Sequence, residues 1–235
     1  MREALISVFV GGIMAYIGPM IKMIKPFMCT ALLALSPAPL LADGEPAGDF
    51  DYYVLALSWT PSWCEETGDD RGSPQCDAGQ GYGFAVHGLW PQYEDGWPSY
   101  CRTTARDPSR SMTSNMADVM GSGGSAWYQW KKHGRCAGLP ADEFFATVRE
   151  AYTAVNRPEV FRRLHDSIDL PASVVEAAFL ETNPDMEADG VTVTCKQGRI
   201  QEVRICLNKD LTPRSCGADT AQDCTLQDAV MDPIR

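Results

Sequence analysis

Short runs of hydrophobic residues lie toward the two ends of the chain, and apolar positions with a helical period lie between them. Residues 50–59 are rich in aromatic and β-favouring residues and short enough for a buried strand, and residues 83–88 are predicted to form a second strand. Alternation in the second strand places Phe84 and Val86 on one face and Ala85 and His87 on the other. The remaining patterns predict helices at about 112–120, 125–137, 141–156, 158–167 and 173–182, and closing strands at 191–196 and 200–207.

Segments rich in Pro, Gly and Asp predict loops at 61–82 and 91–110, and Gly198 marks a turn between the last two strands. Ser173 followed by Glu176 fits a capping box at the start of the last helix. Strands at both ends with helices between them predict an α+β fold instead of a parallel βαβ sheet. With no internal repeat, residues 50–235 are expected to form one domain after a flexible lead at 43–49.

The first 42 residues have the features of a targeting segment. Lys25 precedes an apolar stretch that ends in small residues at Ala42, which predicts a secretory signal peptide covering residues 1–42. The additional apolar run at 4–20 is explained by a start codon assigned too far upstream or by an N-terminal anchor. We favour the upstream start because a spanning helix needs ~20 apolar residues and glycines interrupt this run. A periplasmic or secreted protein without stable membrane association after cleavage is expected.

Composition and cysteines narrow the class of protein. The 45% of hydrophobic residues excludes a disordered chain, and a formal net charge of -11 repels polyanions, so nucleic-acid chemistry would need a local site. One of the 9 cysteines, Cys29, lies in the signal segment, and the even number remaining predicts four disulfides in an oxidising compartment. No CxxC pair exists and the 3 histidines are far apart, so neither a metal nor a cofactor is expected.

Two of the histidines are candidates for catalysis, and His165, among charges on a predicted surface helix, is given no role. On a helix around 126–136, the polar residues Tyr128, Gln129, Lys132 and His133 share one outward arc, opposite Trp127 and Trp130, which are expected to anchor the helix. Together with His87, at the end of a strand, these residue types suggest a metal-free acid and base around an anionic transition state. The alternative is that both histidines are core residues and the lysines form a solvated face.

Two local sequences favour the catalytic interpretation. FAVHGLWP at 84–91 and WKKHGRC at 130–136 closely resemble the two active-site segments of the ribonuclease T2 family, and a looser resemblance covers about residues 50–225. The resemblance implies a disulfide-stapled α+β fold with a central antiparallel sheet and helices packed around it. It also implies cleavage of single-stranded RNA without metal, through attack of the ribose 2'-OH on phosphorus to give a 2',3'-cyclic phosphate. DNA, which lacks the 2'-OH, is expected to be inert.

Residue roles carry over by position within these segments. His133 would be the base that takes the 2'-OH proton, His87 the acid that protonates the departing 5'-oxygen, and Lys132 would stabilise charge on phosphorus. Trp90 aligns with a tryptophan at the family's base site, where stacking suits broad base specificity; its alternative is a core residue.

The chain departs from the family where the second segment usually begins His-Glu-Trp and here contains Tyr128 and Gln129. Tyr128 can donate a hydrogen bond to a phosphate oxygen but brings no positive charge. We expect Gln129 to act as a neutral donor to the phosphoryl oxygen, with less electrostatic support for the reaction.

The resemblance also implies the cysteine pairing and the rival functions. It pairs Cys101 with Cys136, Cys195 with Cys224 and Cys206 with Cys216, which leaves Cys64 with Cys76. A nucleophilic Cys136 is less consistent with an exported protein than this disulfide. The main rival is an exported disulfide-rich binding protein with weak or no catalysis. A metal-dependent phosphoesterase lacks the residue spacing that such sites use. A monomer with RNA as its partner is expected.

Overall fold

A computed structural model describes residues 44–235, and the predicted signal peptide lies outside these residues. Within them, no helix is long and apolar enough to cross a membrane. Six strands form one sheet in the order β2-β1-β5-β6-β3, with β4 paired to β5. Neighbouring strands are antiparallel except for β5 and β6. The strands are β1 (Tyr52–Trp59), β2 (Phe84–Gln92), β3 (Ile168–Leu170), β4 (Val191–Lys196), β5 (Arg199–Leu207) and β6 (Ala229–Met231).

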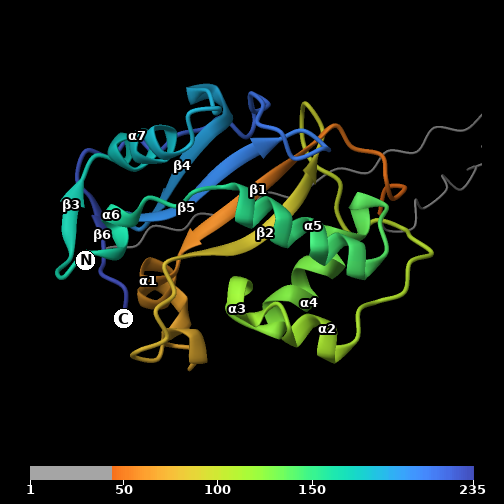
Figure 1. Cartoon of the computed structure of the whole chain (residues 1–235), viewed down its shortest axis with the longest axis horizontal. Helices are drawn as coiled ribbons and strands as arrows, with labels where there is room; N and C mark the ends of the chain where they lie inside the picture. The colour runs from red at the N-terminus through yellow and green to blue at the C-terminus, as the bar shows by residue number, and fades with distance from the viewer. Residues whose placement is uncertain (1–43) are drawn as a thin grey trace, which may run out of the picture. The chain divides into compact units, whose positions relative to one another are not determined.

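Most of the helical residues lie between β2 and β4 in the chain. The α-helices are α1 (Thr60–Trp63), α2 (Arg110–Ser114), α3 (Ala117–Met120), α4 (Gly123–Lys132), α5 (Ala141–Ala154), α6 (Glu159–Arg162) and α7 (Ala172–Thr182). A π-helical turn covers Cys64–Gly68, and 3-10 turns cover Pro74–Cys76, Gly134–Ala137 and Ala188–Gly190. Helix α7 packs on β4, whereas α3, α4 and α5 pack against β2 (Figure 1).

The two faces of the sheet have different roles. On β1, Tyr53, Leu55 and Leu57 face the main core, which also receives side chains from α4, α5 and α7. The intervening Tyr52 and Val54 belong to a much smaller cluster on the other face, beside the half-buried Trp90 of β2. Because helices cover one face of the sheet, the opposite face has room for a cavity.

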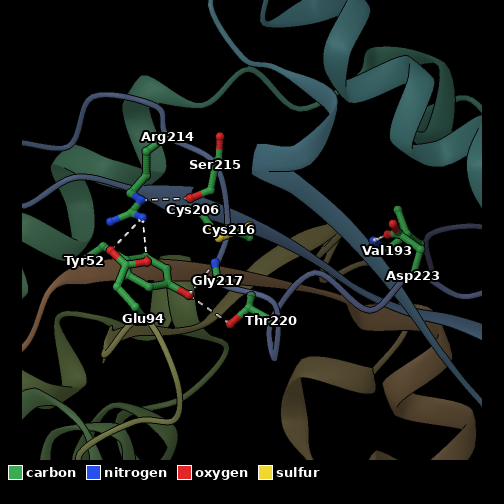
Figure 2. The surroundings of a disulfide bond; sticks show 10 residues. All are labelled: Tyr52, Glu94, Val193, Cys206, Arg214, Ser215, Cys216, Gly217, Thr220 and Asp223. Carbon is green, nitrogen blue, oxygen red and sulfur yellow. Dashed lines mark hydrogen bonds and ion pairs between the residues drawn. A yellow bond between two sulfur atoms is a disulfide. The ribbon is translucent and has the colours of Figure 1, made fainter.

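A loop near the C-terminus is fastened to this second face by the disulfide between Cys206 and Cys216 (Figure 2). The buried Tyr52 hydroxyl accepts a hydrogen bond from the backbone N–H of Gly217, at 3.1 Å, and lies 3.1 Å from Thr220 Oγ1. These contacts hold Thr220 at the wall of the cavity described below.

The α+β prediction is confirmed, and so is the central sheet with helices packed around it. The three-residue strands β3 and β6 were not predicted, because their pairing is decided by contacts between distant segments. The expected helix at 158–167 is wrong beyond Arg162, and that at 112–120 is divided into α2 and α3. The capping box is also wrong: α7 begins after Pro171, so Ser173 lies inside the first turn and caps nothing.

Two predicted loops contain regular structure. The 61–82 segment includes α1 residues and short helical turns, and β2 continues through Pro91 to Gln92. Proline is tolerated there because β2 is an edge strand. Backbone hydrogen bonds tie part of the segment predicted as a flexible lead, at Ala47 and Gly48, to Arg102 and Cys136; its mobility stays a prediction.

Four disulfides staple the domain, and they join the same cysteines that the family resemblance implies. One of them, Cys101–Cys136, lies next to the end of α4 and so next to the candidate site. The pairs are Cys64–Cys76, Cys101–Cys136, Cys195–Cys224 and Cys206–Cys216.

Candidate functional site

A β-bulge in β2 determines where His87 and Trp90 point. Ala56 of β1 pairs with Gly88 and Leu57 pairs with Val86, so His87 is the additional residue on β2. In a regular strand, residues three apart lie on opposite faces, and one additional residue brings them to the same face. The bulge therefore sends Leu89 into the main core and leaves His87 and Trp90 together on the open face, with ring centroids 5.1 Å apart.

The imidazole of His87 is held by a buried carboxylate from β5. Nδ1 of His87 forms a short ion pair with Oε1 of Glu202, whose side chain is 3% exposed, against 42% for His87. Glu202 also accepts hydrogen bonds from the Ser58 hydroxyl, at 3.3 Å, and from Arg204, at 3.2 Å. These contacts occupy Nδ1 and leave Nε2 of His87 free for a ligand.

Glu202 is ionised in this environment. Burial alone would raise the pKa of Glu202, but the hydrogen bond from His87 and the charges of His87 and Arg204 more than offset burial and hold the pKa below its ordinary value. A buried anion fixed in this way holds the imidazole of His87 in one orientation.

The second histidine stands at the C-terminal end of α4. The Ser122 side chain caps the start of this helix by accepting a hydrogen bond from Ser125, and the His133 backbone N–H donates to Gln129 at its end, at 2.9 Å. Gly134 follows, where a Cβ atom would approach Phe144 to 2.7 Å and Trp130 to 2.9 Å. Close packing explains this glycine, because only a residue without a side chain lets the end of the helix approach the core this closely.

His133 is neutral in this structure. It is only 6% exposed, and its Nδ1 is buried with no hydrogen-bond partner among residues 44–235. Burial, with smaller contributions from the charges of Lys132 and His87, lowers the pKa of His133 to about 3. A neutral imidazole is able to accept a proton.

Trp90 connects the two histidines. Its ring centroid is 5.1 Å from that of His87 and 5.3 Å from that of His133. Its indole N–H donates to Oε1 of Gln129, at 2.9 Å, which orients the amide group of Gln129. A Cβ atom at position 88 would lie 2.1 Å from Trp90 Nε1, so Gly88 is needed for this contact.

These side chains line a cavity of about 380 Å³. Lys132 contributes an ammonium group, and the Arg204 guanidinium lies 5.6 Å from the centre of the Trp90 ring. A larger cavity, of about 710 Å³, shares His87, Tyr128 and Gln129 with the first. The site thus has two compartments that meet at these residues. Among residues 44–235, no group of three or more His, Cys, Asp or Glu side chains is placed to hold a metal ion.

The structure brings together every predicted catalytic or binding residue. His87, Trp90, Tyr128, Gln129, Lys132 and His133 all line the smaller cavity. The predicted orientation of α4 needs correction, however, because Gln129 and His133 are buried instead of facing outward. Trp127, expected as a core anchor, is 41% exposed, and only Trp130 is buried. The buried stripe of the helix is formed by Ala126, Gln129, Trp130 and His133. Trp130 lies at one edge of this stripe, and Trp127 lies ~60° further around the helix axis, beyond that edge, so it faces solvent.

Sequence reasoning missed Glu202 and Arg204. In β5 they alternate with Val203 and Ile205, which belong to the main core. Charged residues at alternate positions of an otherwise apolar strand were the available indication that its other face carries a site. Their partners could not be deduced, because His87 lies across β1 and 115 positions away in the chain.

Comparison with known proteins relates this chain to ribonucleases. Residues 50–216 match the Ribonuclease T2 family. A ribonuclease of Aeromonas hydrophila is 35% identical over 185 residues, which cover 77% of this chain and 82% of that protein. Ribonuclease I of Escherichia coli K12 is 27% identical over 228 residues, covering 78% and 85%.

Solved structures share the fold at lower identity. An RNase-related protein from Calystegia sepium has a TM-score of 0.62 and 22% identity, covering 79% of this chain and 97% of that one. RNase NT in complex with 5'-AMP has a TM-score of 0.58 and 20% identity, covering 80% and 100%.

Proposed function

The chain belongs to the ribonuclease T2 family and is a ribonuclease, and from this premise we propose that it cleaves single-stranded RNA without a metal, by 2'-OH transesterification. The observation that carries the proposal is the pairing of two unlike histidines in one cavity. His133 is buried and neutral, whereas His87 is in contact with the Glu202 carboxylate. Such opposed environments are what an acid and a base of one reaction require.

In the proposed reaction, Nε2 of His133 takes the proton of the ribose 2'-OH. The 2'-oxygen then bonds to phosphorus, the bond from phosphorus to the 5'-oxygen breaks, and His87 gives its proton to that oxygen. The products are a 2',3'-cyclic phosphate and a free 5'-OH. A phosphate between the rings would offset the positive charge of Lys132, one of the causes of the low pKa of His133, and so make this base stronger when substrate is bound.

The charges around the phosphate come from several elements. Lys132 of α4 stabilises the negative charge that develops on phosphorus. Glu202 is a positioning residue that keeps Nε2 of His87 directed at the cavity. Gln129, whose carbonyl oxygen is occupied by Trp90, presents its NH₂ group as a neutral donor to a phosphoryl oxygen. Tyr128 adds a hydroxyl donor.

The two compartments fit the two nucleosides that flank the scissile phosphate. The smaller cavity contains the indole of Trp90, so the base on the 2'-OH side stacks there, and stacking on a π-face supports broad base specificity. Because the acid His87 also lines the larger cavity, the nucleoside that carries the departing 5'-oxygen extends into it.

The test is to incubate the purified protein with single-stranded RNA and with DNA of the same sequence, both in excess chelator. We expect RNA fragments that end in a 2',3'-cyclic phosphate and intact DNA. Cleavage that vanished with chelator would indicate a metal-dependent enzyme. Binding of RNA without cleavage, with all four disulfides intact, would favour the rival function as a binding protein. The observation that favours this rival is the replacement of the family's His-Glu by Tyr128 and Gln129.

The disulfides and the N-terminal sequence support export to the periplasm or outside the cell. Cleavage after Ala42 would release a monomeric domain of residues 43–235. This domain would not remain attached to the membrane. Determining the N-terminal residue and the mass in solution of the exported protein checks these points. An N-terminus upstream of Met23 would contradict a signal peptide ending at Ala42.

A further inference from the structure

A third hollow lies beyond the two compartments of the site. The aromatic residue that lines it, Trp127, has no role in the proposed reaction. This outer groove has a volume of about 570 Å³ and lies between α2 and the start of α4, with Arg110 on one side and Trp127 on the other. Gly124 lines both the outer groove and the larger compartment. The two hollows therefore adjoin at this exposed residue.

The groove combines an aromatic surface with local positive charge. Trp127 is 41% exposed, and Lys131 Nζ lies 5.7 Å from the centre of its ring. The exposed Arg110 makes no ion pair within residues 44–235. The acidic neighbour is Asp107, which pairs with Lys131 at 3.4 Å and with Arg135 at 3.2 Å. The positive charge of this groove contrasts with the net charge of -11 of the whole chain.

We propose that the outer groove binds a further nucleotide of single-stranded RNA, on the 3' side of the cleaved bond. The proposal rests on the function given above, because that function fixes the direction of the strand. The departing nucleoside occupies the larger compartment, and its 3'-phosphate then continues past Gly124 toward Arg110. The next base stacks on Trp127, which is how proteins hold single strands without reading their sequence.

The rival explanation is that Trp127 is an isolated surface residue or part of a protein interface. Both rivals predict no effect of Trp127 on how the enzyme treats short and long substrates. The direction of the strand gives a sharper distinction, because only a 3' extension would reach the outer groove.

Three chimeric oligonucleotides test this, each with one ribonucleotide so that only one bond can be cleaved. One is a dinucleotide, one is extended by three deoxynucleotides on the 3' side, and one is extended equally on the 5' side. For the unchanged protein, kcat/KM for the 3'-extended substrate should exceed that for the dinucleotide by roughly 5-fold or more, as expected for one stacked base. The 5' extension should add less.

The decisive quantity is the ratio of kcat/KM for the 3'-extended substrate to that for the dinucleotide. Trp127→Ala should bring this ratio close to one, whereas Trp127→Phe should retain part of it. Arg110→Ala should lower the ratio. For the 3'-extended substrate, it should also make the slope of log(kcat/KM) against log salt concentration shallower by about 0.7. The controls Val174→Ala, in α7, and Arg163→Ala, directly after α6, alter exposed residues that do not line the outer groove, and they should leave the ratio unchanged.

An unchanged ratio in Trp127→Ala, or an equal gain from the 5' extension, would overturn the proposal. Binding of 2'-O-methyl oligonucleotides, measured by fluorescence anisotropy, separates it from the proposed reaction. If no substrate were cleaved but 3' extension still strengthened binding through Trp127, the outer groove would stand and the proposed reaction would fail.

Discussion

The buried carboxylate of Glu202 pairs with the half-exposed imidazole of His87 across the full width of strand β1. The carboxylate lies in β5 and the imidazole in β2, and Ser58 of the intervening strand donates to the same Oε1 atom. Each contact depends on register: the bulge directs His87 to this face, and the pairing of Ser58 with Glu202 places the carboxylate opposite it. The proposed general acid is thus oriented by the sheet itself.

Glu202→Gln tests this relationship, because it keeps the size of the side chain and removes its charge. We expect kcat to fall by roughly 10-fold or more with KM little changed, since the charge-assisted hydrogen bond to the acid becomes a neutral one.

Asp118→Asn is the matched control, since it removes a carboxylate paired with Arg149 on the exterior. A Glu202→Gln enzyme with an unaltered kcat would mean that the carboxylate serves stability alone.

Gln129 is expected to contribute to turnover more than to binding. Gln129→Ala should lower kcat by up to ~10² to 10³, the range for losing one donor to a transition-state oxygen, and change KM much less. Trp90→Phe retains a stacking surface but removes the indole N–H that orients the amide.

A double-mutant cycle of these two substitutions should reveal coupling in kcat, because they share one hydrogen bond. An additive cycle, or a normal kcat in Gln129→Ala, would remove Gln129 from the reaction.

The low pKa of His133 predicts how stability depends on pH. The unfolded chain binds a proton at this ring near pH 6.5 and the folded protein only near pH 3, so the unfolded state holds more protons in between. The free energy of unfolding should therefore fall as the pH drops from about 6.5 toward 3, by at most ~1.4 kcal/mol per pH unit from this group. Glu202, whose pKa is lowered, adds its own loss only below about pH 4.5.

Urea unfolding at pH 7, 6 and 5 isolates the contribution of His133 from that of Glu202. In His133→Asn, the free energy of unfolding should decline less steeply between pH 7 and pH 5 than in the unchanged protein, by up to ~1.4 kcal/mol per pH unit. Equal slopes in the two proteins would show that His133 titrates normally when folded.

The disulfide between Cys101 and Cys136 should support activity as well as stability. Replacing both cysteines by alanine should cost about 2–5 kcal/mol of stability, and should lower kcat even where the protein is fully folded, because the bond lies three residues after His133. Cys195 and Cys224 provide the control, since their separation of 29 residues resembles the 35 of the first pair. If both double variants had the same kcat at low temperature, the first disulfide would have no role in placing His133.

Much of the fold follows from local pattern. The aromatic and β-favouring residues of β1 identified that strand. The two strands near the C-terminus, which are joined by a turn, were predicted at nearly their observed limits. The two segments around His87 and His133 indicated the chemistry, because the needed residue types stand close together within each segment. Even cysteine numbers indicated disulfides.

Tertiary structure decided the rest, because the deciding contacts join residues far apart in the chain. Whether His87 bulges depends on how β1 pairs with β2, and a single-residue shift would reverse the direction of Trp90. The charge environment of His87 comes from Glu202, in a different strand of the sheet. Trp127 and Trp130 have the same chemistry, yet one is exposed and the other buried, because only contact with the core selects which side of a short helix is covered.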